Sequence, residues 1–197
     1  NIQDNTLSRS AEKFLHGCKN KKVLLFNTEK FAESDIKELE TLLNSLYGVF
    51  EVTVKQGEEC TADFILNNFQ DYGLILMVAH GNYLDGKHWI VTGTPVKKTE
   101  WYNQTIETWK KGFGCIYRER FGEGNSYWAI NEDEIGSNMH LEEFEENSIL
   151  YAATCHTFNS NKNLVNAFRI LGLGAFIGFD KAVEYKCAIC GFYEILF

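Results

Sequence analysis

The fold is decided by residues 74–81, which read LILMVAHG: six apolar residues that stop at a histidine and a glycine. A short apolar run without helical periodicity is typical of a strand buried on both faces, as in a parallel sheet. Residues 149–156, ILYAATCH, repeat the pattern and reach a cysteine. Because reactive groups collect at the carboxyl ends of parallel strands, we expect His80 and Cys155 to lie at the same edge of a sheet.

The segments around these runs alternate between strand and helix patterns. Further strands are expected at 22–27, 50–54 and 175–179, and helices at 36–46, 61–69, 163–171 and 183–196. This alternation predicts right-handed βαβ crossovers. The expected fold class is therefore α/β: a three-layer α/β/α sandwich with a mostly parallel sheet.

Residues 82–147 interrupt the alternation as a long irregular insert, which holds all four tryptophans and the only proline. A segment of this length without strong periodicity is usually a lid or a binding surface. Its tryptophans either line a substrate cleft or anchor the insert to the sheet. Within it, Asp85-Gly86 predicts a hairpin turn, and Asn131 predicts the N-cap of a helix.

Length and charge limit the class of protein. The 197 residues are enough for one domain with a substantial core, and we expect an N-terminal arm over residues 1–20 and a single domain over residues 21–197. The net charge of -8 argues against nucleic acid or an anionic membrane as a partner. No apolar stretch is long enough to span a membrane. From its polar N-terminus we expect no secretory signal in this sequence, and both a cytoplasmic and a secreted location stay open.

His80 and Cys155 are residue types that act as a base and a nucleophile. A thiolate attacks carbonyl groups once its pKa is lowered, and a neighbouring imidazole lowers it and then protonates the leaving amine. Gly81 lacks a Cβ and so lets a carbonyl approach, and its N–H and that of Cys155 are candidate donors to an oxyanion. Each motif alone is more often structural, since a strand-end cysteine is commonly a small buried hydrophobe. Their occurrence together favours a cysteine hydrolase.

The other cysteines and histidines have structural explanations. Cys187 and Cys190 have the spacing of metal ligands, but no second pair completes a site. We expect both to lie on a helix and to pack in the core of the protein. His156 follows Cys155 directly, so in an extended chain its side chain points away from the thiol. We expect no metal ion and no cofactor. The remaining histidines are expected to be exposed: His16, His88 and His140.

A hydrophobic block ending in His80-Gly81, followed by a block ending in a small residue and Cys155, resembles the caspase-like (clan CD) cysteine peptidases. The likeness covers roughly residues 22–196, and residues 173–179, LGAFIGF, look like the following strand of bacterial CHAT and clostripain-type members. The resemblance implies a caspase-like topology and hydrolysis of peptide bonds through a thioester. It also implies that His80 is the general base, Cys155 the nucleophile, and Gly81 with Cys155 the oxyanion hole.

The likeness has departures that concern the substrate. Metacaspases and clostripain carry an acid two residues before the nucleophile that binds a basic P1 side chain, whereas this chain has Ala153. In separase an acid after the next strand does this, and Asp180 or Glu184 is the corresponding candidate here. Both are equally well explained as solvated charges. The family's domain continues beyond the end of this chain, so we expect a C-terminal portion to be missing.

The expected function is that of a cysteine endopeptidase acting on a protein or peptide, with a regulatory protein as a second kind of partner. The alternative is a catalytically inactive caspase-like domain that serves as a scaffold or sensor in a larger protein. A third hypothesis is a flavodoxin-like domain that binds a small molecule. Residues 26–30, FNTEK, disfavour it because they lack a glycine-rich phosphate loop.

Overall fold

The computed structural model describes residues 19–46, 49–96, 113–117, 126–139, 143–158 and 162–196. Most of the expected N-terminal arm lies outside these ranges. The same holds for His16, His140, Trp101 and Trp109.

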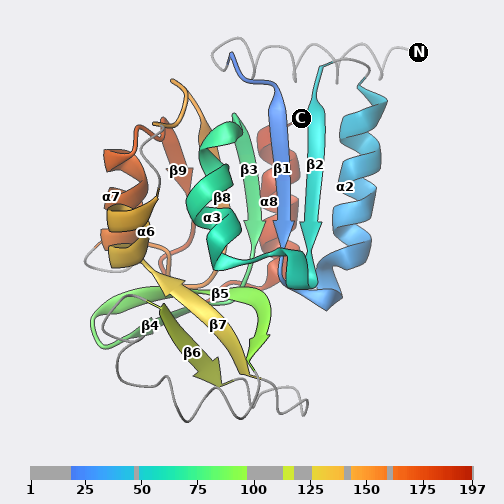
Figure 1. Cartoon of the computed structure of the whole chain (residues 1–197). Helices are drawn as coiled ribbons and strands as arrows, with labels where there is room; N and C mark the ends of the chain where they lie inside the picture. Colours follow the sequence, from blue (N-terminus) through green and yellow to red (C-terminus); the bar gives the residue numbers. More distant parts are fainter. Residues whose placement is uncertain are drawn as a thin grey trace.

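Five parallel strands form the main sheet (Figure 1) in the order β2-β1-β3-β8-β9. They are β1 (Lys22–Asn27), β2 (Glu51–Gln56), β3 (Leu74–Val78), β8 (Ile149–Ala153) and β9 (Ala175–Ile177). β3 lies at the centre, and every residue in it is at most 2% exposed. Burial on both faces explains why this strand reads as a continuous apolar run. The prediction of an α/β fold with a mostly parallel sheet is confirmed.

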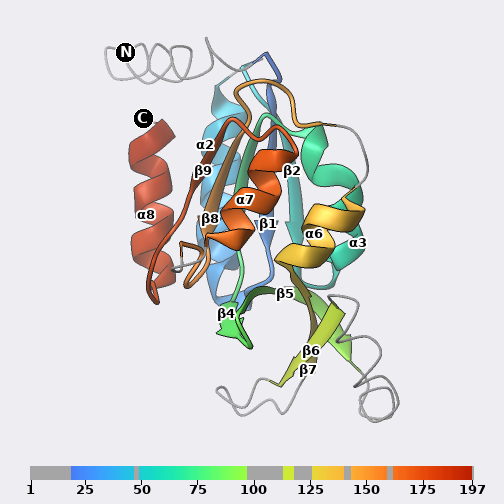
Figure 2. The same cartoon turned by 90° about the vertical axis from the view of Figure 1, so that its left-hand side faces the viewer.

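Helices cover both faces of this sheet (Figures 1 and 2). On one face lie α2 (Glu33–Ser45) and α8 (Tyr185–Leu196), and on the other α3 (Ala62–Asn68), α6 (Glu132–Asn138) and α7 (Asn163–Ile170). Successive residues of a strand point to opposite faces. Val23 and Leu25 of β1 therefore join the core beneath α2 and α8. Leu24 and Phe26 join the core beneath the other three helices.

A second, antiparallel sheet follows His80 directly and lies beyond the carboxyl ends of the parallel strands (Figure 1). Its strands are β4 (Gly81–Leu84), β5 (Lys87–Val96), β6 (Phe113–Tyr117) and β7 (Ser126–Asn131), in the order β4-β5-β7-β6. The expectation of an irregular insert is therefore wrong for these residues. The pairing of β5 with β7 shifts register between Val91 and Pro95, and such a bulge breaks the apolar alternation that identifies a strand.

Two local predictions within this region are confirmed. Asp85 (φ 52°) and Gly86 (φ 79°) form the turn between β4 and β5, with the two left-handed residues that a tight hairpin requires. Asn131 caps α6, since its Oδ1 accepts hydrogen bonds from the backbone N–H groups of Asp133 and Glu134 at 3.0 and 3.2 Å. The cap fixes where the chain leaves the second sheet and returns to the main one.

Two other predictions about side chains have opposite outcomes. Trp89 on β5 is 1% exposed, which agrees with packing in the interior and not with the lining of an open cleft. Cys187 and Cys190 on α8 are exposed, and it is the intervening Ala188 and Ile189 that are buried, so the expected core packing of the two cysteines is wrong. Among the described helices, none has both the length and the apolar character to cross a membrane.

Candidate active site

His80 and Cys155 lie just past the carboxyl ends of β3 and β8, which are neighbours in the sheet. Val78 pairs with Ala153, so His80 and Cys155 each stand two residues beyond the same rung of the ladder. The parallel arrangement thus brings an imidazole and a thiol to the carboxyl edge of the main sheet. The second sheet lies beyond this edge (Figure 1). His80 is about one-third exposed, and Cys155 is half-buried.

Glu29 forms an ion pair with His80, with 3.5 Å between its Oε2 and the histidine Nε2. It follows β1, the strand that pairs with β3 on the side away from β8. The residue is only 3% exposed, and its Oε1 accepts a hydrogen bond from the Thr28 hydroxyl at 2.9 Å. Asn27 holds its backbone through two hydrogen bonds of 3.0 Å. A carboxylate in this position orients an imidazole and stabilises its protonated form.

Sequence reasoning missed Glu29. The signal was present, because Glu29 stands two residues past the predicted strand 22–27, as His80 and Cys155 stand past theirs. A lone acid in a polar loop gave no reason to prefer it over other solvated charges.

The Cys155 thiol is held by the backbone of Val183. The N–H of Val183 lies 3.5 Å from Sγ, and the Val183 carbonyl oxygen lies 3.9 Å from it. The Val183 N–H can therefore donate to the sulfur, and the thiol S–H can donate to the Val183 carbonyl. The two chain segments run alongside each other, since the N–H of His156 donates to the Lys181 carbonyl at 3.1 Å.

The chain turns sharply at His156, which has a φ of 60°. The extended backbone on which the orientation of its side chain was predicted is therefore absent. A left-handed conformation costs a residue with a side chain about 1–2 kcal/mol. Strain of this kind is common where a catalytic side chain must be presented at a strand end.

Gly81 packs against the backbone carbonyl of Cys155. A Cβ added at Gly81 would lie 2.3 Å from that oxygen and 2.9 Å from both the His88 Nε2 and the Thr154 Cγ2. Contacts this short exclude any side chain, so only glycine lets β4 begin here. The main chain that follows His80 therefore touches the main chain of Cys155.

His88 on β5 is buried, with 1% exposure, so the expectation that it is exposed is wrong. Its Nε2 lies 2.9 Å from the Cys155 carbonyl oxygen, and its backbone N–H donates to the Glu132 Oε2 at 2.6 Å. Burial lowers the pKa of His88 to about 4, and the nearby His156 adds to this, against the opposite effect of the hydrogen bond to Cys155. The ring is neutral at physiological pH.

The three candidate substrate-binding residues fall in two environments. Ala153 is 5% exposed and belongs to the core beneath α8. Asp180 and Glu184 are both exposed, on the segment between β9 and α8 that also carries Val183. Sequence reasoning also missed two aromatic residues at this edge. The rings of Phe31 and Tyr185 lie 4.5 Å apart, and the Phe31 ring lies 6.3 Å from that of His80.

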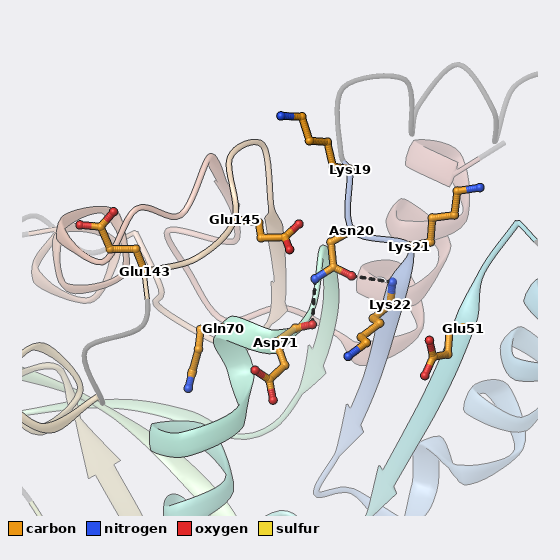
Figure 3. A pocket seen from close by; sticks show the side chains of 9 residues that line it. All are labelled: Lys19, Asn20, Lys21, Lys22, Glu51, Gln70, Asp71, Glu143 and Glu145. Carbon is orange, nitrogen blue, oxygen red and sulfur yellow. Dashed lines mark hydrogen bonds between the residues drawn. The ribbon is translucent and has the colours of Figure 1, made fainter.

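A pocket of about 470 Å³ lies at the opposite edge of the main sheet, near the amino ends of β1 and β2 (Figure 3). Charged side chains of both signs line it, and the lining residues that the structure describes include no cysteine or histidine. Its rim is fixed by Asn20, whose Nδ2 donates to the Asp71 carbonyl at 2.8 Å. The thiol of Cys155 and the imidazole of His80 lie at the carboxyl edge of the main sheet, so we take that edge as the candidate active site.

The described residues contain no group of three or more His, Cys, Asp or Glu side chains arranged to hold a metal ion. The chemistry available at the carboxyl edge is that of a thiol, an imidazole and a carboxylate. Comparison with known proteins finds no matching family model, no matching curated protein and no matching solved structure.

Proposed function

We propose that this protein is a cysteine endopeptidase of the caspase-like kind, with Cys155 as nucleophile and His80 as general base. The observation that carries the proposal is the placement of these two residues at equivalent positions past neighbouring parallel strands. The strand order β2-β1-β3-β8-β9, with helices on both faces, supports a three-layer α/β/α sandwich of caspase-like topology.

In the proposed reaction His80 accepts the thiol proton of Cys155, and the sulfur attacks the carbonyl carbon of a peptide bond. The oxyanion that forms accepts hydrogen bonds from the N–H groups of Gly81 and Cys155. The C–N bond then breaks, and His80 gives the proton to the departing amine. His80 next removes a proton from water as the water attacks the thioester carbonyl. The C–S bond then breaks, the sulfur takes the proton back from His80, and the acid is released.

Glu29 serves this mechanism as a positioning residue. Its carboxylate fixes the imidazole of His80 and stabilises the imidazolium that exists between the two proton transfers. Its burial supports this role, because the energy of an ion pair rises as water is excluded.

Asp180 and Glu184 are the candidate residues for binding a Lys or Arg side chain at the P1 position of the substrate. Both carboxylates are exposed beside the segment that contacts the Cys155 thiol, where a Lys or Arg side chain of a peptide can reach them. A peptide library with varied P1 residues tests this, since neutral variants at these two positions should lose preference for Lys and Arg.

The proposal as a whole is tested by the rate of iodoacetamide labelling at each cysteine near pH 6, followed by mass spectrometry, in the wild type and in His80→Ala. We expect fast labelling of Cys155 that is lost in the variant, because only an activated thiolate reacts quickly at this pH. The exposed Cys187 and Cys190 are controls in the same sample. Equal, slow labelling of Cys155 in both proteins would contradict the proposal.

One observation favours a second candidate, a catalytically inactive domain that acts as a scaffold or sensor. Among the described residues, the hydrogen bonds of the Cys155 sulfur go to the backbone of Val183 and not to His80. Slow labelling of Cys155 that does not depend on His80 is the result this candidate predicts, so the same experiment separates the two.

A further inference from the structure

We infer that His88 is a positioning residue for the nucleophile, and that its hydrogen bond to the Cys155 carbonyl holds the turn that presents the thiol. The inference rests on the proposed function, because it concerns how the same site is kept in its reactive geometry. His88 comes from β5, in the second sheet, and so from neither of the strands that carry the base and the nucleophile.

The hydrogen bond has a defined direction. A carbonyl oxygen can only accept, so the proton must be on the Nε2 of His88, 2.9 Å from the Cys155 oxygen. Within the described part of the chain no hydrogen-bond partner lies beside the Nδ1, so a proton on that buried atom would have no acceptor, and the Nδ1 is unprotonated. A ring that donates from one nitrogen and is bare at the other is a neutral donor.

His88 is itself held in place. Its backbone N–H donates to the Oε2 of Glu132 at 2.6 Å, and the Oε1 of Glu132 accepts from the Asn163 side chain at 3.4 Å. Glu132 begins α6 and Asn163 begins α7, so these hydrogen bonds join β5 to two of the helices that cover the main sheet. Glu132 is 4% exposed and His88 is 1% exposed. The hydrogen bonds of its backbone and the burial of its side chain keep the His88 imidazole beside the Cys155 carbonyl.

The peptide unit between Cys155 and His156 is fixed at both of its polar ends. Its oxygen accepts from His88, and its N–H donates to the Lys181 carbonyl at 3.1 Å. A peptide unit is planar, so fixing both ends sets the dihedral angles on either side of it. One of these angles is the φ of His156, which lies in the left-handed region at 60°. The other belongs to Cys155 and sets the direction in which its side chain leaves the backbone.

The same strand also holds the base. The N–H of Val91 donates to the carbonyl oxygen of His80 at 2.9 Å, three residues along β5 from His88. β5 therefore touches the backbone of both proposed catalytic residues. Small displacements of reacting groups cost large factors in rate, so a residue that fixes the nucleophile's peptide unit affects turnover without touching the substrate.

The test compares His88→Gln with His88→Leu. The glutamine amide can donate to the Cys155 carbonyl but cannot titrate, whereas leucine fills similar space and has no donor. We expect His88→Leu to lower the rate of Cys155 labelling and the kcat for a peptide substrate about tenfold, with KM changed less than about twofold. His88→Gln should keep both rates within about threefold of the wild type.

A structural role alone would lower thermal stability without this pattern of rescue. Labelling of Cys155 at the wild-type rate in folded His88→Leu would overturn the inference, and so would equal loss in the two variants. If His88→Leu does not fold, His88→Asn replaces it, because its amide is one methylene shorter and does not reach the carbonyl. His80→Ala is measured alongside: unchanged labelling there contradicts the proposed function, whereas a normal His80 effect with no His88 effect contradicts only this inference.

Discussion

The carboxylate of Glu29 lies 3.5 Å from the imidazole of His80, although 51 positions separate the two in the chain and each follows a different strand. The parallel pairing of β1 with β3 brings them together, since Asn27 is opposite Val78 and each residue follows that pair by two positions. Three consecutive strands across the sheet, β1, β3 and β8, thus end in an acid, a base and a thiol in spatial order.

Replacing Glu29 by Gln should lower the rate of Cys155 alkylation at pH 6 about tenfold, because a charge-assisted contact to the imidazolium is lost. The rate is measured by mass spectrometry across pH 5 to 9. Glu33→Gln is the matched control, since Glu33 is an exposed acid close by in the chain, at the start of α2. An equal effect of the two substitutions would show that general charge, and not the ion pair, matters.

Cys60 should resist alkylation in the folded protein at any pH below about 9. Burial raises the pKa of its thiol to about 12, and its S–H donates to the Asn27 carbonyl at 3.3 Å. Cys187 and Cys190 should react readily at pH 8.5, because both are exposed. Labelling in guanidinium chloride is the control, and there Cys60 should react like the others. Rapid labelling of Cys60 without denaturant would contradict its buried environment.

Stability should fall in acid because of His88. Its pKa is lowered from 6.5 to about 4 in the folded protein, so below pH 6.5 the unfolded chain binds a proton that the folded protein refuses until about pH 4. The free energy of unfolding should therefore drop by about 3 kcal/mol between these two values, with no contribution from His88 above pH 6.5.

Two other ionisable side chains, Glu132 and His156, lie near His88, and their effect on stability must be separated from that of His88. Burial raises the pKa of Glu132, which favours proton uptake by the folded protein and so acts in the opposite direction, and His156 also lies nearby. Urea denaturation of His88→Gln at the same pH values isolates the histidine, because this variant keeps both neighbours. Parallel stability curves for the two proteins would count against a buried neutral His88.

Gly81→Ala should disable the site. Its Cβ would lie 2.3 Å from the Cys155 oxygen, so the backbone of either β4 or the turn at Cys155 and His156 must shift. We expect alkylation of Cys155 at pH 6 to fall at least about tenfold, since small displacements of reactive groups are costly. Gly136→Ala is the control: its Cβ would meet only the Ala167 Cβ at 3.8 Å, and alanine in a helix is preferred over glycine by up to about 1 kcal/mol. A reactive Cys155 in Gly81→Ala would remove the argument for close packing here.

The central strands of the parallel sheet, β1, β3 and β8, were predictable because they are buried on both faces. β1 coincides with the expected strand at 22–27, and β3 and β8 differ from the expected strands by one residue at one end. The second sheet was not predictable from periodicity, since a register shift and a proline fall within its longest strand. The turn at Asp85-Gly86 and the cap at Asn131 carried local signals strong enough to be recognised.

The candidate site was predictable in the two residues that chemistry singles out and not in those that support them. His80 and Cys155 stand out because His80 follows an apolar run directly and Cys155 follows one after Thr154. Glu29 depends on which strands become neighbours, and that is a property of the assembled sheet. His88 follows a turn and a lysine, a pattern that indicates exposure. It is buried because it packs against the backbone of Cys155 and the start of α6.

The double attachment of β5 sets where the chain tolerates a change in length. His88 and Val91 are three positions apart, roughly 10 Å along an extended strand, and they hold the carbonyls of Cys155 and His80. Residues added at the Asp85-Gly86 tip leave this spacing intact, so variation in hairpin length is free to accumulate there. One residue inserted between His88 and Val91 turns one of them to the opposite face of the strand. We therefore expect engineered insertions in this hairpin to be tolerated at its tip and not between His88 and Val91.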